Sequence, residues 1–310
     1  MNHLLAILTA LVPLFGLIVL GTFLARWRFP GAEFWQRLER LIYFILFPAL
    51  LVESLASAPL DPSRISPLLL AVVMTLCAGS GLVFATQPLL RLDGPALSSL
   101  YQGSIRFNTY LGIAIVMAVF EPSTLAVMAL VIGLMIPLVN LGCVLVLSRF
   151  AGGDGSAVGM FKSLTRNPLI LGCLVGLGLN LSGLGLHPSF ALGFSFAGEA
   201  AVPLGLMCVG AGLSLQRLNA DRSALVGAGM IKLLLLPLLA AMIAHVVGLG
   251  IQETQVLVVF AALPTATSAY ILARQMGGDH GLIAGMLTVQ TAAAVISLPI
   301  VLALLASHGS

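Results

Sequence analysis

Charged residues are scarce in this sequence. Only 8% of its 310 residues are Asp, Glu, Lys or Arg, whereas 59% are hydrophobic and the mean hydropathy is +1.11. A soluble globule of this length needs more polar surface than such a composition supplies. The basic residues form no cluster outside the flanks of the hydrophobic runs, so the net charge of +3 does not indicate nucleic-acid binding. Composition therefore indicates a protein embedded in a lipid bilayer.

Motifs for nucleotide hydrolysis, metal binding and intramembrane catalysis are absent as well. The sequence has no Gly-Lys-Ser/Thr, no HExxH, no GxSxG with a nearby histidine and no paired aspartates inside a hydrophobic run. Its four cysteines lie singly in different runs, where we expect small apolar fillers rather than ligands. We therefore expect no cofactor, and neither an ATP-driven pump made by this chain alone nor an enzyme.

Ten hydrophobic runs are each long enough for a helix that crosses the membrane. Of the twelve Lys and Arg residues in the connections or at the very ends of the runs, eleven lie in connections after odd-numbered runs, and only Arg64 lies after an even-numbered one. Because basic loops stay in the cytoplasm, both termini are expected outside and the middle loop inside, in the bacterial inner membrane. The runs are expected near residues 4–24, 38–57, 66–88, 97–118, 122–147, 168–184, 190–213, 223–248, 254–275 and 281–306.

The runs divide into two sets of five around a Gly-rich linker at 149–167, which is expected in the cytoplasm. An odd number of runs per set places the two sets in opposite orientations. We therefore predict an all-α membrane protein of two inverted repeats, 1–148 and 168–310, a plan that recurs in secondary transporters with a substrate site near the midplane. Weak internal similarity favours it, since Pro13, Gly21 and Pro48 match Pro168, Gly176 and Pro203 at a constant offset.

The fourth and ninth runs are interrupted near their middles. Asn108 lies in a polar cluster of run four, and Pro264, which has no amide hydrogen, interrupts run nine. The predicted topology brings two new helix N-termini together at the midplane, where their positive ends favour an anion such as a carboxylate. Thr265 and Thr267 are expected to cap the second of these ends. The alternative is a simple kink at Pro264, with Asn108 bonded to a neighbouring helix.

Two basic residues and one acidic residue are expected deep in the membrane, where a charge is costly. Arg106 can pair with Glu199, neutralise a bound anion or extend its side chain toward the cytoplasm. Lys232 is either a structural partner or a counter-charge for substrate. Glu253, near the outer end of a run, is expected in water.

Asn140 and Gln290 are either site residues or hydrogen-bonding contacts between helices. The predicted substrate-binding residues are Arg106, Asn108, Thr109, Gly112, Asn140, Pro264, Thr265, Thr267, Tyr270 and Gln290, with Lys232 and Glu199 as charge partners or coupling residues.

Over essentially its whole length the chain resembles the auxin efflux carrier family. The resemblance is carried by Asn108-Thr109 followed by Gly112, by 263–265 with 270–274, and less specifically by 47–51. It implies broken fourth and ninth helices that cross, as in sodium/proton antiporters. It also implies a scaffold of runs 1, 2, 6 and 7, a transport core of runs 3–5 and 8–10, and elevator-type motion. Small carboxylates such as malonate and malate are the implied substrates, or indole-3-acetate in plant members.

The chain departs from the plant pattern in two places. Ile113-Ala114 follow Gly112 where the plant carriers have a proline, and Leu51 replaces a serine, so auxin-like recognition is not implied. No aspartate lies within a run, and the residues leave proton coupling, sodium coupling and uniport open.

We expect a secondary transporter of small organic anions; the alternative is an anion channel or a substrate-sensing receptor on the same scaffold. The lipid bilayer and the anion are the expected partners. Stripes of small residues fit either a homodimer or packing within one protomer.

Overall fold

The computed structural model describes residues 2–57, 62–152, 167–213 and 221–308, and all regular secondary structure in these residues is helical. Every predicted run coincides with helical structure, whereas most of the predicted linker at 149–167 lies outside the described residues. The elements are α1 (Asn2–Arg26), α2 (Ala32–Leu41), the π-helix η1 (Ile42–Leu46), α3 (Phe47–Ala56), α4 (Pro62–Leu90), α5 (Gly94–Ile105), α6 (Thr109–Val119), α7 (Thr124–Phe150), α9 (Pro168–Leu181), α10 (Pro188–Ala211), α11 (Arg222–Met230), the π-helix η3 (Ile231–Leu235), α12 (Leu236–Val247), α13 (Ile251–Ala262), α14 (Thr267–Met276) and α15 (His280–His308).

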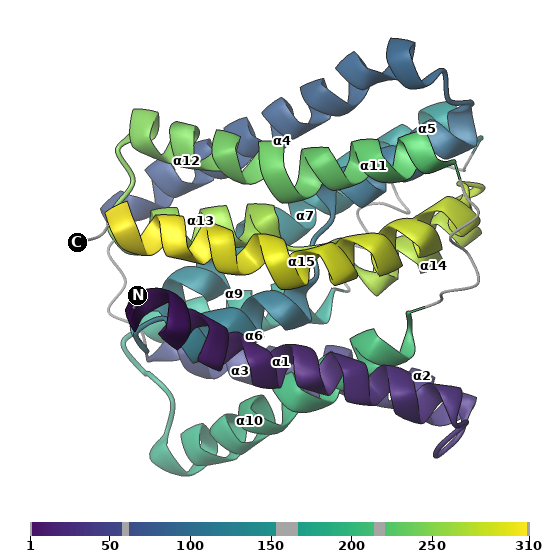
Figure 1. Cartoon of the computed structure of the whole chain (residues 1–310). Helices are drawn as coiled ribbons and strands as arrows, with labels where there is room; N and C mark the ends of the chain where they lie inside the picture. The colour runs from purple at the N-terminus through teal and green to yellow at the C-terminus, as the bar shows by residue number, and fades with distance from the viewer. Residues whose placement is uncertain (1, 58–61, 153–166, 214–220, 309–310) are drawn as a thin grey trace.

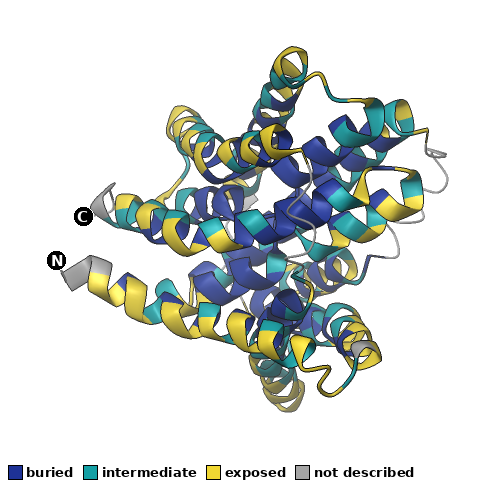
Figure 2. Cartoon of the chain, turned by 45° about the vertical axis from the view of Figure 1, so that its right-hand side comes forward, coloured by how far each residue is buried: buried dark blue, intermediate teal, exposed yellow. Residues whose placement is uncertain are grey.

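The long helices have the length and composition of membrane spans. Within the described residues, 6 helical segments are long and apolar enough to cross a bilayer, and the bent pair α13–α14 makes a seventh if it is counted as one span. Their outward faces are apolar; Val12 and Val246, for example, are 68% and 77% exposed, and exposed residues cover the periphery in Figure 2. Lipid, unlike water, solvates such faces. α1 begins and α15 ends on the same side of the molecule (Figure 1). The chain is a multi-pass membrane protein.

Two π-helical turns precede prolines. η1 runs into Phe47-Pro48, and η3 runs into Leu236-Pro237. A proline ring clashes with the carbonyl group four residues earlier, and a π-turn inserts one extra residue into the helix at that point. The chain therefore continues through both prolines without leaving the helix, and α2–η1–α3 and α11–η3–α12 each form one uninterrupted helical segment.

α1 and α10 pack with their backbones in contact. A Cβ atom added to Gly21 would overlap the carbonyl oxygen of Met207, and one added to Gly210 would overlap that of Ile18. Thr22 Oγ1 also donates a hydrogen bond to the Gly210 carbonyl at 2.9 Å. α3 packs on α9 and α10, so α1, α3, α9 and α10 form one packed group.

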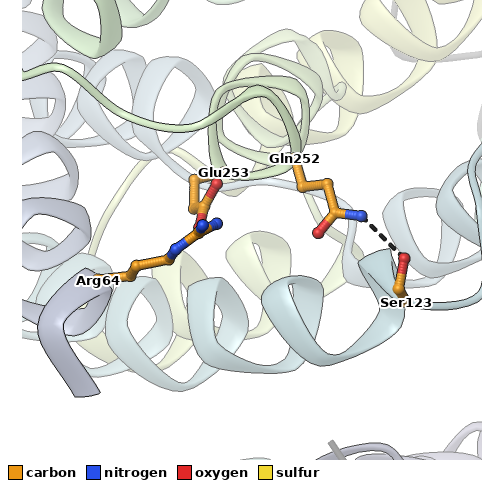
Figure 3. A network of polar contacts seen from close by, with 4 residues as sticks. All are labelled: Arg64, Ser123, Gln252 and Glu253. Carbon is orange, nitrogen blue, oxygen red and sulfur yellow. Dashed lines mark hydrogen bonds and ion pairs between the residues drawn. The ribbon is translucent and has the colours of Figure 1, made fainter. Parts of the chain in front are cut away.

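On the opposite side of the molecule, α12 lies against α4 and α13 (Figure 1). The first turn of α13 is tied to two neighbours (Figure 3). Arg64 Nη1 lies 3.1 Å from Glu253 Oε1, and Gln252 Nε2 donates to Ser123 Oγ at 2.8 Å. The expectation that Glu253 lies in water is wrong: it is only 4% exposed and pairs with Arg64.

Several helices begin at a side-chain cap. Asp93 accepts from the Ala96 amide at 2.9 Å, and Asn167 accepts from Leu169 at 3.0 Å, so the first turns of α5 and α9 have acceptors for amides that no helical carbonyl reaches. Asp221 caps α11. Hydrogen bonds from the Ser223 hydroxyl and the first-turn amides lower the pKa of the Asp221 carboxyl.

Candidate functional site

The predicted fourth run contains a complete break. α5 ends at Ile105, residues 106–108 are extended, and α6 begins at Thr109. Asn108 is the N-cap residue: its Oδ1 accepts from the Leu111 amide at 3.2 Å. An asparagine in extended conformation starts a helix in this way because its side chain replaces a missing backbone acceptor. The predicted helix N-terminus at Asn108 is therefore present.

The predicted ninth run is also broken. α13 ends at Ala262, α14 begins at Thr267, and the two axes differ by 55°. Pro264 lies in the break and has no amide to donate. The expected caps are not formed: Ala266 is the N-cap residue, and no side chain of the described residues caps it. Thr265 precedes the N-cap position, and Thr267 is already inside the helix, so neither can cap its first turn.

The two breaks touch each other. The Asn108 amide donates to the Pro264 carbonyl at 2.8 Å, and Thr265 Oγ1 lies 3.4 Å from the Gln102 carbonyl oxygen. Gln290 joins both breaks from α15: its Oε1 accepts from the Thr265 amide and its Nε2 donates to the Gly103 carbonyl, each at 2.9 Å. Gln290 is fully buried and does not line the cavity. Its two hydrogen bonds therefore make it a contact between helices.

Gly112 permits close approach of α6 to α13. A Cβ atom added there would lie 2.7 Å from Leu263 Cδ1 and 2.9 Å from Phe260 Cζ. Both distances are too short for a carbon–carbon contact. In this structure Gly112 therefore serves packing behind the breaks.

A cavity of about 1270 Å³ opens in front of the breaks. The predicted binding residues that line it are Arg106, Asn108, Thr109, Asn140, Thr267 and Tyr270. Those that do not are Gly112, Pro264, Thr265 and Gln290, which lie behind this surface.

The charged lining residues of the cavity are four arginines, Arg28, Arg40, Arg106 and Arg274, and one acid, Glu39. This excess of positive charge favours an anionic occupant.

Arg106 presents its guanidinium to the cavity while remaining 8% exposed. Nη2 donates to Asn140 Oδ1 at 2.9 Å and Nη1 to Ser268 Oγ at 3.2 Å. Nε is buried and has no acceptor among the described residues. The proposed pairing with Glu199 is not formed, because the structure places Glu199 on an exposed face of α10. The position of Glu199 along the predicted run does not indicate which side of the helix its side chain faces.

Asn108 also retains an unused donor. Its Oδ1 serves α6, but Nδ2 is buried and finds no acceptor within the described residues. The residue is 2% exposed and lines the cavity. A buried donor without a partner is costly, and such sites commonly await a ligand or water. Asn108 Nδ2 and Arg106 Nε are thus two buried donors without an acceptor among the described residues near the meeting point of the breaks.

Sequence comparison agrees with this architecture. Residues 6–302 match the model of a family described as membrane transport protein. The chain belongs to this family, the family of the auxin efflux carriers. It is also 30% identical, over 295 residues, to an uncharacterized transporter of Methanothermobacter thermautotrophicus, with 92% of this chain and 93% of that protein covered.

In this membrane transport protein, Lys232 lies away from the cavity. Its side chain is fully buried in η3, with Nζ 3.5 Å from the Phe260 carbonyl oxygen and 6.0 Å from the centre of the Phe107 ring. Phe107 lines the cavity and Lys232 does not. Among the described residues no carboxylate pairs with this ammonium group.

Sequence reasoning missed Glu39 and Ser268. Glu39 accepts a hydrogen bond from Thr267 Oγ1 at 2.8 Å, across the cavity wall from α2 to α14. It lies beside Arg40 at the expected end of a run, where charged residues usually face water, so no local signal marks it. Ser268 lies in the polar segment of run nine, and only the fold reveals its contact with Arg106.

Proposed function

We propose that this chain is a secondary transporter of small organic anions, carboxylates such as malonate or malate, working by elevator-type alternating access. The observation that carries the proposal is the cavity at the two breaks, whose charged lining among the described residues is four arginines and one acid. Two buried donors of its lining residues, Asn108 Nδ2 and Arg106 Nε, have no acceptor among the described residues and would need one after a small side-chain movement. Hydrogen bonds to charged groups contribute about 1.5–3 kcal/mol each, so two such donors favour a carboxylate over a neutral solute.

The N-termini of α6 and α14 add to this preference. Thr109 and Thr267 are the first residues of these helices, and both line the cavity. The unpaired amides of a first helical turn carry partial positive charge, and this charge is screened little away from water. A carboxylate placed between the two helix ends would interact favourably with both.

For the motion we propose ten spans in two inverted repeats. Spans 1, 2, 6 and 7 would form a fixed scaffold, and spans 3–5 and 8–10 a moving core. Support comes from the packed group of α1, α3, α9 and α10, which meets α6 at the ring stack of Phe47 on Tyr110, 4.9 Å between centroids. The core would carry the site past this contact.

With termini outside and the middle loop in the cytoplasm, the lining residues Arg28, Arg40 and Arg274 would lie on the cytoplasmic side, and the cavity would open inward. In a bacterial inner membrane the membrane potential would contribute about 2.3 kcal/mol per charge per 100 mV toward export of an anion. This driving force would support uniport.

The first experiment combines binding and flux. Purified protein is screened by thermal shift against mono- and dicarboxylates at millimolar concentration, with and without sodium and at two pH values. We expect carboxylate-dependent stabilisation. Proteoliposomes are then loaded with a carboxylate that stabilises the protein, and counterflow of labelled substrate is measured. Saturable flux with counterflow fits a carrier. Non-saturating flux would indicate a pore, binding without flux would indicate a sensor, and absence of both would contradict the proposal.

A further inference from the structure

The N-terminus of α14 faces the cavity without a side-chain cap. Ala266 is its N-cap residue, and Ala266, Thr267 and Ser268 all line the cavity. The first amides of a helix have no helical acceptor, and they make this end attractive to an anion. At the other break, Asn108 supplies an acceptor to α6. The α14 end has no such internal acceptor among the described residues.

A carboxylate of the chain lies at this helix end. Glu39 Oε1 is 2.8 Å from Thr267 Oγ1, in the first turn of α14. Glu39 lines the same cavity, is half-buried, and forms no ion pair with a lysine or arginine of the described residues. The contact that the structure gives this carboxylate is therefore the Thr267 hydroxyl, in the first turn of α14.

This contact joins elements that belong to different groups of helices. Glu39 comes from α2, which packs on α10, whereas α14 packs on α15 and α5. The next residue, Ser268, accepts from Arg106 on the opposite side. Consecutive residues of α14 are thus held by an acid from one group and an arginine from the other.

We propose that Glu39 is a tethered competitor of the substrate. In the empty inward-facing carrier its carboxylate occupies the N-terminus of α14, and an incoming carboxylate displaces it. Displacement breaks the hydrogen bond between Glu39 and Thr267 and frees α14 from α2, so that the loaded core can move. Glu39 acts through α14 and is a positioning residue. This inference rests on the proposed transport of carboxylates.

The test removes the charge of Glu39 while keeping its shape. In Glu39→Gln the amide oxygen still accepts from Thr267, so folding should be unchanged. At an effective dielectric constant of about 20, repulsion between unit charges as far as about 12 Å apart corresponds to roughly tenfold in affinity. The dissociation constants of malonate and malate, measured by calorimetry on the full chain, should therefore fall about tenfold.

The matched control is Glu33→Gln. Glu33 lies on the same helix, is exposed, pairs with Arg37 and does not line the cavity. Glu33→Gln removes the same charge from the protein as Glu39→Gln, and we expect less than a twofold change in affinity. Tightening of equal size in Glu33→Gln would assign the effect to net charge and overturn the role of Glu39.

A second variant separates charge from hydrogen bonding. Thr267→Val removes the bond to Glu39 but leaves its carboxylate. Because Thr267 also lines the cavity, the effect of charge is measured by adding Glu39→Gln to this variant, which should still tighten binding about tenfold. A merely structural bond predicts the reverse: an effect in Thr267→Val and none in Glu39→Gln. Weaker binding in Glu39→Gln, as expected if the acid contacts a donor group on the substrate, would also overturn the inference.

The outcomes for the two proposals differ. Binding to the wild type without tightening in Glu39→Gln overturns the competitor alone and leaves the transporter intact. Binding that is detected only in Glu39→Gln supports both. Absence of malonate and malate binding in the wild type and in Glu39→Gln overturns both.

Discussion

The two helix ends at the centre of this protein differ in how their first turns are completed. α6 is capped by Asn108, a residue of its own break, which is buried and also keeps a free donor for the cavity. α14 starts at Ala266 without a side-chain cap and is contacted by Glu39 from a distant helix. The first end is built by local sequence and the second by tertiary structure. We infer that α6 is the rigid half of the site and α14 the adjustable half.

The largest expected effect is at the capped end. Asn108→Asp keeps an oxygen that can cap α6 but replaces the Nδ2 donor by negative charge. Losing one charge-assisted hydrogen bond and adding repulsion should reduce carboxylate flux by on the order of 100-fold. Flux in proteoliposomes, normalised to folded protein, measures this. Asn108→Ala should also abolish flux while the amount of folded protein is maintained. Wild-type flux in either variant would remove Asn108 from the site.

Gln290 tests how firmly the two ends are joined. Gln290→Leu strips the Thr265 amide and the Gly103 carbonyl of their buried partner, which costs about 1–3 kcal/mol for each group. We expect stability to fall by about 2–4 kcal/mol in thermal or denaturant unfolding. Gln252→Leu, which removes an exposed bond to Ser123, is the control and should change stability little. Equal losses in the two variants would show that the link between the breaks is not special.

Substitution of Gly112 tests how closely α6, the capped helix, packs on α13. In Gly112→Ala the new methyl group overlaps Leu263 and Phe260, and overpacking of this kind costs about 1–3 kcal/mol. Gly81→Ala in α4 is the control: no atom lies within 4 Å of the added carbon, so helix propensity should stabilise it by about 0.5–1 kcal/mol. Opposite signs in the unfolding midpoints support close packing of α6 on α13, and the same sign would contradict it.

The smallest expected effect removes the difference between the two ends. Ala266 has the extended backbone of an N-cap residue, so Ala266→Ser can supply the missing acceptor to α14. Such caps contribute about 0.5–2 kcal/mol, and stability should rise by about 1 kcal/mol. The unfolding midpoint checks this. No gain would mean that the contact with Glu39 already satisfies the first turn.

The sequence predicts both breaks because their causes are local. A proline lacks an amide at any depth, and an asparagine caps a helix wherever its backbone is extended, so residues 106–108 and 263–266 could be located in advance. The run boundaries are similarly local, since about 20 apolar residues are needed to cross a bilayer.

The direction in which a side chain faces was not predictable. In lipid the outside of a helix is as apolar as its inside, so hydropathy does not distinguish the two faces. For this reason the predicted depth of Glu199 in the membrane left open which way it faces, and it lies on an exposed surface. Glu39 was overlooked because its partner Thr267 is 228 positions away. The sequence left open whether Gln290 is a site residue or a contact between helices. Its bonds to the Thr265 amide and the Gly103 carbonyl decide this.

The glycine contacts between α1 and α10 have a mechanical consequence. With carbonyl oxygens seated where side chains would otherwise begin at Gly21 and Gly210, neither helix can slide or roll past the other without steric collision. α1 and α10 should therefore move as one rigid body. In the proposed elevator motion any displacement would have to be accommodated elsewhere, for example at the contact between the rings of Phe47 and Tyr110.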